Sequence, residues 1–155
     1  MKGTTILLVE DTGDDEYLVK RVLAKINLGN NLVVMRDGAE ALDYIYGTGI
    51  HANRDTTQMP AVVFLDLKLP KVSGLEVLRR IRADERTRSL PVVVLSSSQE
   101  EQDLIQSYNL GANSYIRKPV EFTEFTDAIQ QMGFYWLLLN ELPLPQRKPR
   151  TPTVA

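Results

Sequence analysis

The 155-residue sequence contains no cysteine, and this absence excludes several kinds of chemistry at once. Without thiols the chain has no disulfide bonds, no thiolate metal ligands and no cysteine nucleophile. A cysteine-free chain also fits a reducing compartment, and we expect this protein to be cytoplasmic. The only histidine, His51, has no second histidine or cysteine with which to form a metal site. We therefore expect His51 to be a solvated surface residue rather than a metal ligand or a phosphate acceptor.

The sequence also lacks an excess of one charge and a long apolar run. It has 18 Lys and Arg against 20 Asp and Glu, so we expect no surface for nucleic acid and no face attracted to a membrane. The apolar segment near the N-terminus is too short for a signal peptide or a membrane span. No repeat of solenoid length occurs. With 43% hydrophobic residues, the chain is expected to form one domain around a core of its own.

Short apolar segments alternate with segments of helical periodicity along most of the chain. The expected strands are residues 5–9, 32–35, 62–65, 91–95 and 114–116, and the expected helices are residues 14–26, 39–46, 75–81, 99–108 and 122–139. Strands without polar alternation are typical of a parallel sheet with helices on both faces. The alternation therefore predicts an α/β fold with a doubly wound, five-stranded parallel sheet and five helices.

Two segments stand outside this alternation. Residues 47–60 are polar and glycine-bearing, and predict a long loop on the side opposite the carboxyl ends of the strands. Residues 143–155 hold four of the eight prolines and three basic residues, which is typical of a disordered tail. We therefore expect one domain over residues 1–142 and a Pro-rich basic tail over residues 143–155, with no output domain after it.

The end of the last expected helix is more apolar than one buried face requires. Phe134, Trp136, Leu137 and Leu138 lie in a run that is hydrophobic on every side of a helix. Such a helix end predicts a surface that associates with a second copy or with another protein. The alternative is that residues 142–144 fold back and cover it.

Polar residues follow the expected strands at the points where the strands end. Glu10 and Asp11 follow the first strand, Asp66 the third, Ser96 the fourth and Lys118 the fifth. In a parallel sheet these ends meet at one edge, although Asp66 taken alone could simply cap a turn. Three carboxylates at one edge repel one another unless a hard cation such as Mg²⁺ binds them. With a lysine and a hydroxyl but no histidine base nearby, the set suits a carboxylate that accepts a phosphoryl group and holds it.

Four sequence segments carry a resemblance to response-regulator receiver domains. They are VED at residues 9–11, FLDLKLPKVSG at 64–74, VVVLSSS at 92–98 and YIRKP at 115–119, and the resemblance covers residues 4–129. It implies a flavodoxin-like fold with strand order 2-1-3-4-5. Two positions depart from the common pattern: glutamate stands at the first acid, and serine replaces threonine at the switch hydroxyl.

The resemblance also implies a role for each site residue. Asp66 would carry the phosphoryl group, Lys118 would pair with its oxygens, Ser96 and Tyr115 would form the switch, and Mg²⁺ would be bound by Asp66, Asp11, Glu10 partly through water, and the Lys68 carbonyl oxygen. The expected protein is a single-domain response regulator that receives its phosphoryl group from a sensor histidine kinase and is not an enzyme.

A narrower resemblance links the loop at residues 47–60 and the aromatic end of the last helix to the regulators of bacterial phytochrome kinases. It implies a homodimer that forms through the fourth helix, the fifth strand and the fifth helix. Two other functions stay open. A small phosphatase with an Asp nucleophile generally has a second acid two residues after the nucleophile, where this chain has Lys68. A flavodoxin-like module that binds a nucleotide or flavin would need a glycine-rich loop after Val9, which is missing.

Overall fold

The computed structural model of the chain describes residues 4–118 and 122–141. The strands are β1 (Ile6–Val9), β2 (Leu32–Met35), β3 (Val62–Leu65), β4 (Val92–Ser96) and β5 (Ser114–Arg117). The helices are α1 (Gly13–Lys25), α2 (Gly38–Tyr46), α3 (Gly74–Ala83), α4 (Glu101–Asn109) and α5 (Phe122–Phe134), with the short turns η1 (Gly29–Asn31), η2 (Gly49–His51) and η3 (Tyr135–Leu139). Within these residues no helix is long and apolar enough to cross a membrane.

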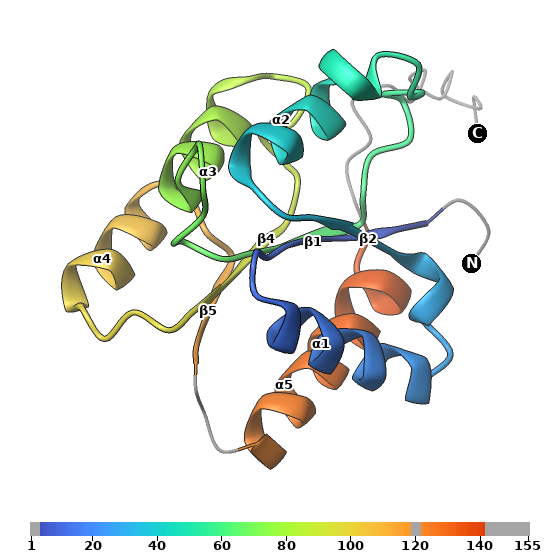
Figure 1. The fold of residues 1–155 in the computed structure, drawn as a ribbon, viewed down its shortest axis with the longest axis vertical. Coiled ribbons are helices and arrows are strands. Elements are labelled where there is room, and N and C mark those ends of the chain that lie inside the picture. The colour runs from blue at the N-terminus through green and yellow to red at the C-terminus, as the bar shows by residue number, and fades with distance from the viewer. Residues whose placement is uncertain (1–3, 119–121, 142–155) are drawn as a thin grey trace, which may run out of the picture.

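The five strands form one parallel sheet in the order β2-β1-β3-β4-β5, which confirms the predicted fold class and strand order. Helices α1 and α5 lie on one face, and α2 and α3 lie on the other, with α4 beyond them next to β5 (Figure 1). Because β1 pairs in register with both β2 and β3, their carboxyl ends stop at the same level. The loops that follow the strands therefore meet along one edge of the sheet.

Each face of the sheet carries its own hydrophobic core. Side chains alternate along a strand, so Leu7 and Val9 pack under α2 and α3 whereas Ile6 and Leu8 pack under α1 and α5. All four of these residues are fully buried. Burial on both faces explains why the strand sequences show no polar alternation.

The helix ends agree with their sequence signals in two cases and differ in a third. Gly47 ends α2 in the left-handed region, with φ 65°, as expected of a terminal glycine. The Ser73 hydroxyl accepts a hydrogen bond from the Glu76 N–H at 3.2 Å and caps α3. Helix α4 begins at Glu101 and not at residue 99, because the Ser98 hydroxyl accepts a hydrogen bond from the Glu100 N–H and holds that turn outside the helix.

The loop at residues 47–60 is more ordered than its sequence predicts. It contains the η2 turn, and the Arg54 guanidinium donates hydrogen bonds to the carbonyl oxygens of Ile45 (3.0 Å) and Gln58 (2.8 Å). The same guanidinium lies 4.3 Å from the ring centre of Tyr44. His51 packs edge-on against Tyr44, with 5.3 Å between ring centres, and is half-buried. The expectation of a solvated histidine is therefore wrong, because the loop folds back onto α2.

The last helix changes form at its end. After α5, the η3 turn is π-helical, and the Asn140 N–H donates to the Tyr135 carbonyl oxygen at 2.7 Å. This turn directs Leu137 into the core under α1 and α5, where it is buried, and Trp136 is half-buried against the same core. The prediction of an exposed surface is therefore wrong for Leu137.

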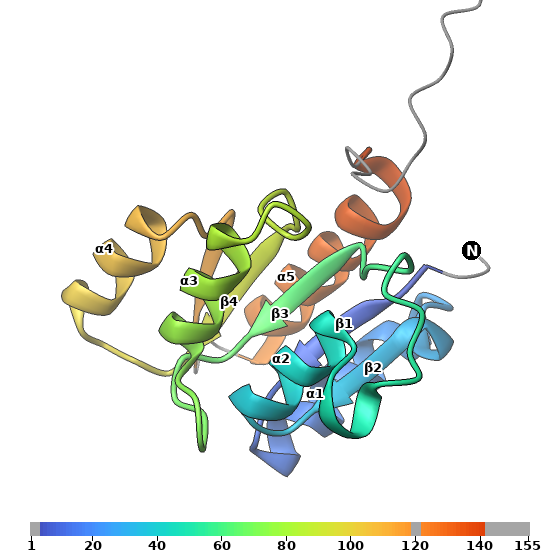
Figure 2. The ribbon, with the colours of Figure 1, turned by 90° about the horizontal axis from the view of Figure 1, so that it is seen from above.

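Other side chains at this end of the chain remain exposed. Phe134 is 39% exposed and Leu138 is 43% exposed. In Figure 2, η3 lies at the end of the sheet from which the strand arrows point away. The expected tail at residues 143–155 and the alternative fold-back at residues 142–144 lie outside the described residues.

Candidate functional site

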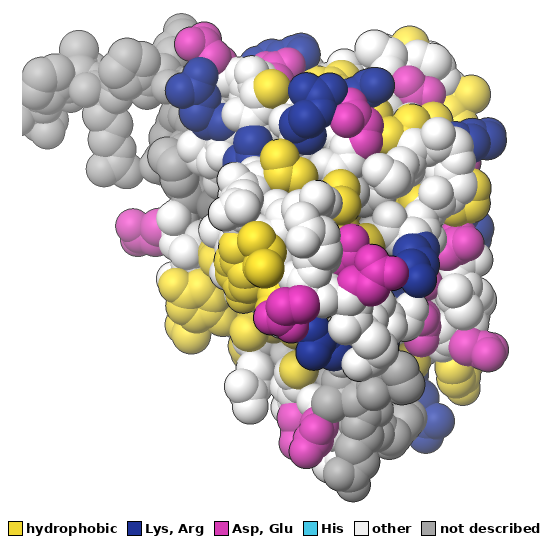
Figure 3. Space-filling view, turned by 90° about the vertical axis from the view of Figure 1, so that its left-hand side faces the viewer, with side chains coloured by type: hydrophobic (Ala, Val, Ile, Leu, Met, Phe, Trp, Pro, Cys, Tyr) yellow, Lys and Arg dark blue, Asp and Glu magenta, His cyan; other side chains and the backbone are white. Residues whose placement is uncertain are grey.

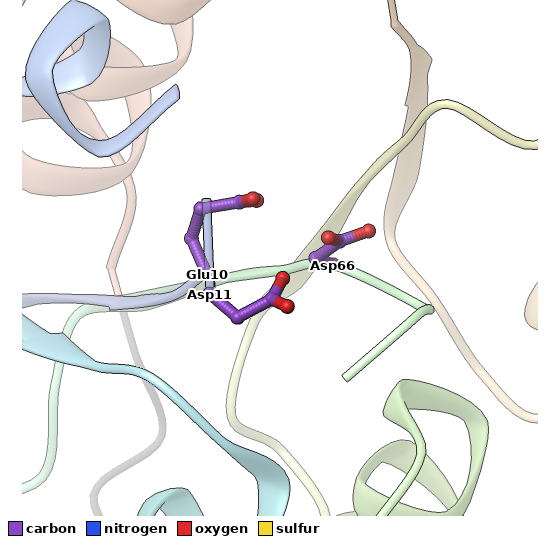
Figure 4. Close-up of side chains that lie close together, drawn as sticks. All are labelled: Glu10, Asp11 and Asp66. Carbon is purple, nitrogen blue, oxygen red and sulfur yellow. The ribbon is translucent and has the colours of Figure 1, made fainter. Parts of the chain in front are cut away.

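The three predicted acids meet at the carboxyl edge of the sheet. Glu10 and Asp11 follow β1, Asp66 follows β3, and the two strands are aligned so that Val9 pairs with Leu65. One carboxylate oxygen from each acid lies within 4.8 Å of one from each of the others (Figure 4). Glu10 and Asp66 are buried, whereas Asp11 is exposed. The parallel sheet thus brings together the acids that the sequence places at the ends of two different strands.

Burial raises the pKa values of two of these acids, so that they ionise less readily. Loss of solvent raises the pKa of Glu10 from 4.5 to about 7, although the positive charge of Lys118 partly opposes this shift. Burial also raises the pKa of Asp66, again against the effect of Lys118. The Asp66 Oδ1 atom accepts a long hydrogen bond, 3.4 Å, from the Lys68 N–H. Ionisation of both buried acids is therefore unfavourable unless further positive charge is bound nearby.

This arrangement fits a divalent cation with oxygen ligands. Three carboxylate oxygens at this spacing, one of them on an exposed residue, leave room for the water ligands that Mg²⁺ retains. The predicted backbone ligand, the carbonyl oxygen of Lys68, belongs to the residue two positions after Asp66, at the start of the loop that follows β3. A cation bound here would offset the repulsion between the negative charges of Glu10 and Asp66, which burial strengthens.

Lys118 reaches the site from the end of β5, where it contacts two acids. Its Nζ atom donates hydrogen bonds to Glu10 Oε2 at 3.0 Å and to Asp15 Oδ2 at 2.7 Å. Within the described chain, Lys118 makes no ion pair with Asp66. Burial by itself would lower the pKa of Lys118, but the hydrogen bond with Asp15 and the charge of Glu10 outweigh it and raise that pKa. The ammonium therefore stays charged.

Asp15 contacts the site although the sequence did not predict it as a site residue. Its place in the first turn of α1 is explained by the helix dipole alone, because acids are common there. The sequence feature that could have indicated this role is the position of Asp15 just after the acidic pair. A helix that starts at the edge of the sheet places its first turn beside the strand ends. Only the tertiary structure shows that β5 delivers a lysine to the same point.

Ser96 and Tyr115, the predicted switch residues, lie on neighbouring strands. The Ser96 hydroxyl is buried and accepts a hydrogen bond from the Ser98 N–H at 3.0 Å. Ser98 in turn donates to Asp103 Oδ2 in the first turn of α4 at 2.5 Å. The Tyr115 ring packs against the core under α2 and α3, and its buried hydroxyl has no hydrogen-bond partner among the residues described. The site thus connects to α4 through Ser98.

A comparison with models of protein families identifies the family to which this chain belongs. The model of the response regulator receiver domain matches residues 6–130. The chain belongs to the response regulator receiver family. Several relatives of this receiver carry names that state a function.

Three relatives are similar to this receiver over most of their length. The response regulator Rcp1 of Synechocystis sp. (strain ATCC 27184 / PCC 6803 / Kazusa) is 36% identical over 138 residues, covering 89% of this chain and 92% of that protein. Its Mn²⁺-bound crystal structure superposes with a TM-score of 0.81 and covers 90% of this chain and 99% of that one. The phosphorylated cyanobacterial phytochrome response regulator RcpA is 37% identical, with a TM-score of 0.81 over 90% of this chain and 98% of that one.

The third relative is the bacteriophytochrome response regulator AtBRR. It is 54% identical, with a TM-score of 0.70 over 89% of this chain and 98% of that one. These relatives of the receiver are response regulators.

Proposed function

We propose that this receiver is a single-domain response regulator that accepts a phosphoryl group on Asp66 from the phosphohistidine of a sensor histidine kinase. The observation that carries this proposal is the meeting of a buried carboxylate, Asp66, with two further acids and a buried lysine at the carboxyl edge of the sheet. Membership of the receiver family and the phosphorylated state of RcpA support it.

The transfer is a displacement at phosphorus. An oxygen of the Asp66 carboxylate attacks in line and forms a P–O bond as the P–N bond of the phosphohistidine breaks, and the imidazole nitrogen keeps the electron pair. The Lys68 N–H orients the carboxylate. Lys118 pairs with the phosphoryl oxygens, and the Ser96 hydroxyl donates to one of them. Tyr115, on the strand next to Ser96, is the second switch residue, and its burial responds to the movement of Ser96.

Mg²⁺ is the cation that we assign to this site. Glu10, Asp11, Asp66 and the Lys68 carbonyl oxygen would hold it, and it would supply positive charge against the charge that develops on the phosphoryl oxygens. The Mn²⁺-bound form of Rcp1 supports a divalent cation in a relative of this size and fold.

A bacterial phytochrome is the kinase partner that the relatives favour. AtBRR, at 54% identity, is named as a bacteriophytochrome response regulator, and RcpA as a phytochrome response regulator. We therefore assign this receiver to light signalling through such a kinase. A location in the cytoplasm fits the cysteine-free composition.

A homodimer through α4, β5 and α5 is the interface that we propose for signal output. Helix α4 exposes Ile105 (49%) and Tyr108 (52%), and β5 is an edge strand of the sheet. Phe134 and Leu138, at the end of α5 and in η3, add apolar surface. Figure 3 views the side on which α4 lies in Figure 1 and shows a hydrophobic patch with acidic side chains beside it. Ser98 connects the phosphorylation site to α4 and so to this surface.

Lys68 argues against the rival function, a phosphatase that turns over small phosphoesters. It stands where that class has its second acid, and it is an exposed lysine without a carboxyl group. We therefore propose that the protein is not an enzyme of this kind and that it carries one phosphoryl group per chain. Steady hydrolysis of small phosphoesters over many turnovers would contradict this.

The decisive experiment measures the intact mass of the protein after incubation with acetyl phosphate and Mg²⁺. We expect the wild type to gain the mass of one phosphoryl group and Asp66→Asn to gain none, because the amide is a poor nucleophile. Asp14→Asn, at an exposed acid in the first turn of α1, is the matched control and should label like the wild type. Equal labelling of Asp66→Asn and the wild type would remove the assignment of Asp66.

A further inference from the structure

The Lys118 ammonium is held by two acids that differ in their access to water. It donates to Glu10 Oε2 at 3.0 Å and to Asp15 Oδ2 at 2.7 Å. The Glu10 side chain is 1% exposed, whereas the Asp15 side chain is 34% exposed. An ammonium has three donors, so two of them are already in use. The third alone cannot satisfy the several oxygens of an incoming phosphoryl group.

The difference in exposure decides which partner Lys118 gives up. Releasing the buried Glu10 would leave its Oε2 atom without this hydrogen bond and away from water, which is unfavourable even where a cation balances the charge. Releasing Asp15 lets its carboxylate be hydrated again, and this costs far less. This difference in cost favours Asp15 as the partner that the ammonium would exchange for phosphoryl oxygens.

The position of Asp15 also affects the acid cluster before phosphorylation. Asp15 lies on α1, so its pull on Lys118 opposes movement of the ammonium toward Asp66. A positive charge close to Asp66 would repel a divalent cation bound by the same carboxylates. Holding the lysine on the α1 side leaves the cluster open to the cation.

We propose that Asp15 is a positioning residue that holds the Lys118 ammonium toward α1 and away from Asp66 until a phosphoryl group arrives. The proposal rests on the function proposed above, in which Lys118 binds the phosphoryl group carried by Asp66. It assigns to Asp15 two opposite effects: it favours binding of the cation, and it competes with the phosphoryl group for the lysine.

The test compares Asp15→Asn with Asp14→Asn in two titrations by calorimetry. Both variants lose one negative charge from the first turn of α1, but Asp14 forms no ion pair within the described chain and does not contact Lys118. The first titration measures the affinity of the metal-free protein for Mg²⁺. The second measures the affinity for fluoroberyllate, a stable mimic of the phosphoryl group, at saturating Mg²⁺.

We expect Asp15→Asn to bind Mg²⁺ about two- to fivefold more weakly and fluoroberyllate about two- to fivefold more tightly than Asp14→Asn, the range typical of a partly exposed ion pair. In a Lys118→Met background the two variants should give equal Mg²⁺ affinities, because the interaction that Asp15 makes is gone. A second substitution, Asp15→Ser, repeats the measurement should the amide disturb the fold.

Two results would overturn the inference. If Asp15→Asn and Asp15→Ser weaken both titrations together, the residue has a merely structural role. If they match Asp14→Asn in both, the contact has no effect on the lysine. Failure of the proposed function is separable from both, because it would appear as missing phosphorylation of the wild-type protein at Asp66.

Discussion

Gly74, the first residue of α3, is the point at which a single added carbon would disturb the site most directly. A Cβ atom on Gly74 would lie 2.1 Å from the Asp66 carbonyl oxygen and 2.6 Å from the Leu67 Cα atom. Both neighbours are backbone atoms, so neither can rotate out of the way. The glycine lets α3 start directly against the strand end that carries Asp66, and the Gly74 N–H donates to the Leu67 carbonyl oxygen at 2.9 Å.

At this scale we predict that Gly74→Ala lowers the free energy of unfolding by about 1–3 kcal/mol, the range for overpacking a well-filled site. The same substitution should slow labelling by acetyl phosphate, because the loop must move and takes Asp66 with it. Urea denaturation and mass spectrometry measure the two effects. Gly13→Ala is the control, since a Cβ atom there meets nothing within 4 Å. Equal stability of the two variants would contradict this prediction and would show that the backbone at Asp66 can move to accommodate the added methyl group.

At the scale of secondary-structure elements, helix α1 is held against the sheet by its apolar face and also by a buried charged residue, Glu16. Glu16 accepts hydrogen bonds from Lys20 on α1 at 2.7 Å and from Arg36, just after β2, at 3.0 Å. The hydrogen bond from Lys20, the largest effect, and the charge of Arg36 hold the pKa of Glu16 below its ordinary 4.5. This contact fixes the start of α1, the turn that also carries Asp15.

We predict that Glu16→Gln lowers the free energy of unfolding at pH 7 by about 0.5–1 kcal/mol, because both cationic partners are half exposed to solvent. The folded-state pKa lies below the unfolded value, so the unfolded chain binds the proton first as the pH falls. The stability gained from Glu16 is therefore present above pH 4.5 and is lost progressively below it.

Urea denaturation at several pH values measures this difference between the wild type and Glu16→Gln. Glu85→Gln, at a side chain that is 89% exposed, is the control and should show little effect at any pH. A difference that grows as the pH falls below 4.5 would contradict the assigned sign.

For the molecule as a whole, we expect the acid cluster to make stability depend on a bound cation. Glu10 and Asp66 are buried close together, so ionising both in the folded protein without a cation carries a cost of burial and of repulsion that the unfolded chain does not have. We predict that Mg²⁺ at a hundredfold excess over its Kd raises the free energy of unfolding by about 2.7 kcal/mol.

Thermal unfolding with and without a chelator measures this gain. Asp11→Asn removes one ligand and should lose most of the gain at the same Mg²⁺ concentration, whereas Asp14→Asn should keep it. An equal gain in all three proteins would place the cation elsewhere.

The proposed dimer is a second property of the whole molecule. We predict that Leu138→Ser shifts the sedimentation of the protein toward the monomer, because Leu138 exposes 43% of its surface at the end of the last helix. Ile50→Ser is the matched control. Ile50 is 81% exposed but lies in η2, on the loop between α2 and β3. Unchanged sedimentation of Leu138→Ser would contradict the proposed interface.

The sequence by itself determined the sheet and the meeting of the acids. Continuous apolar strands alternating with helices leave a parallel sheet as the fold, and parallel strands end at one edge. The positions of Glu10, Asp11 and Asp66 just after their strands were therefore enough to predict that these side chains converge. This inference needs only the direction of the strands and no knowledge of side-chain packing.

The tertiary structure alone decided which groups contact one another across elements. Lys118 pairs with Asp15, 103 residues earlier in the chain, because β5 ends where α1 begins. Leu137 enters the core because a π-helical turn changes the direction of its side chain, and His51 is half-buried because its loop folds onto Tyr44. Such contacts depend on packing between distant segments, and local sequence patterns contain no information about it.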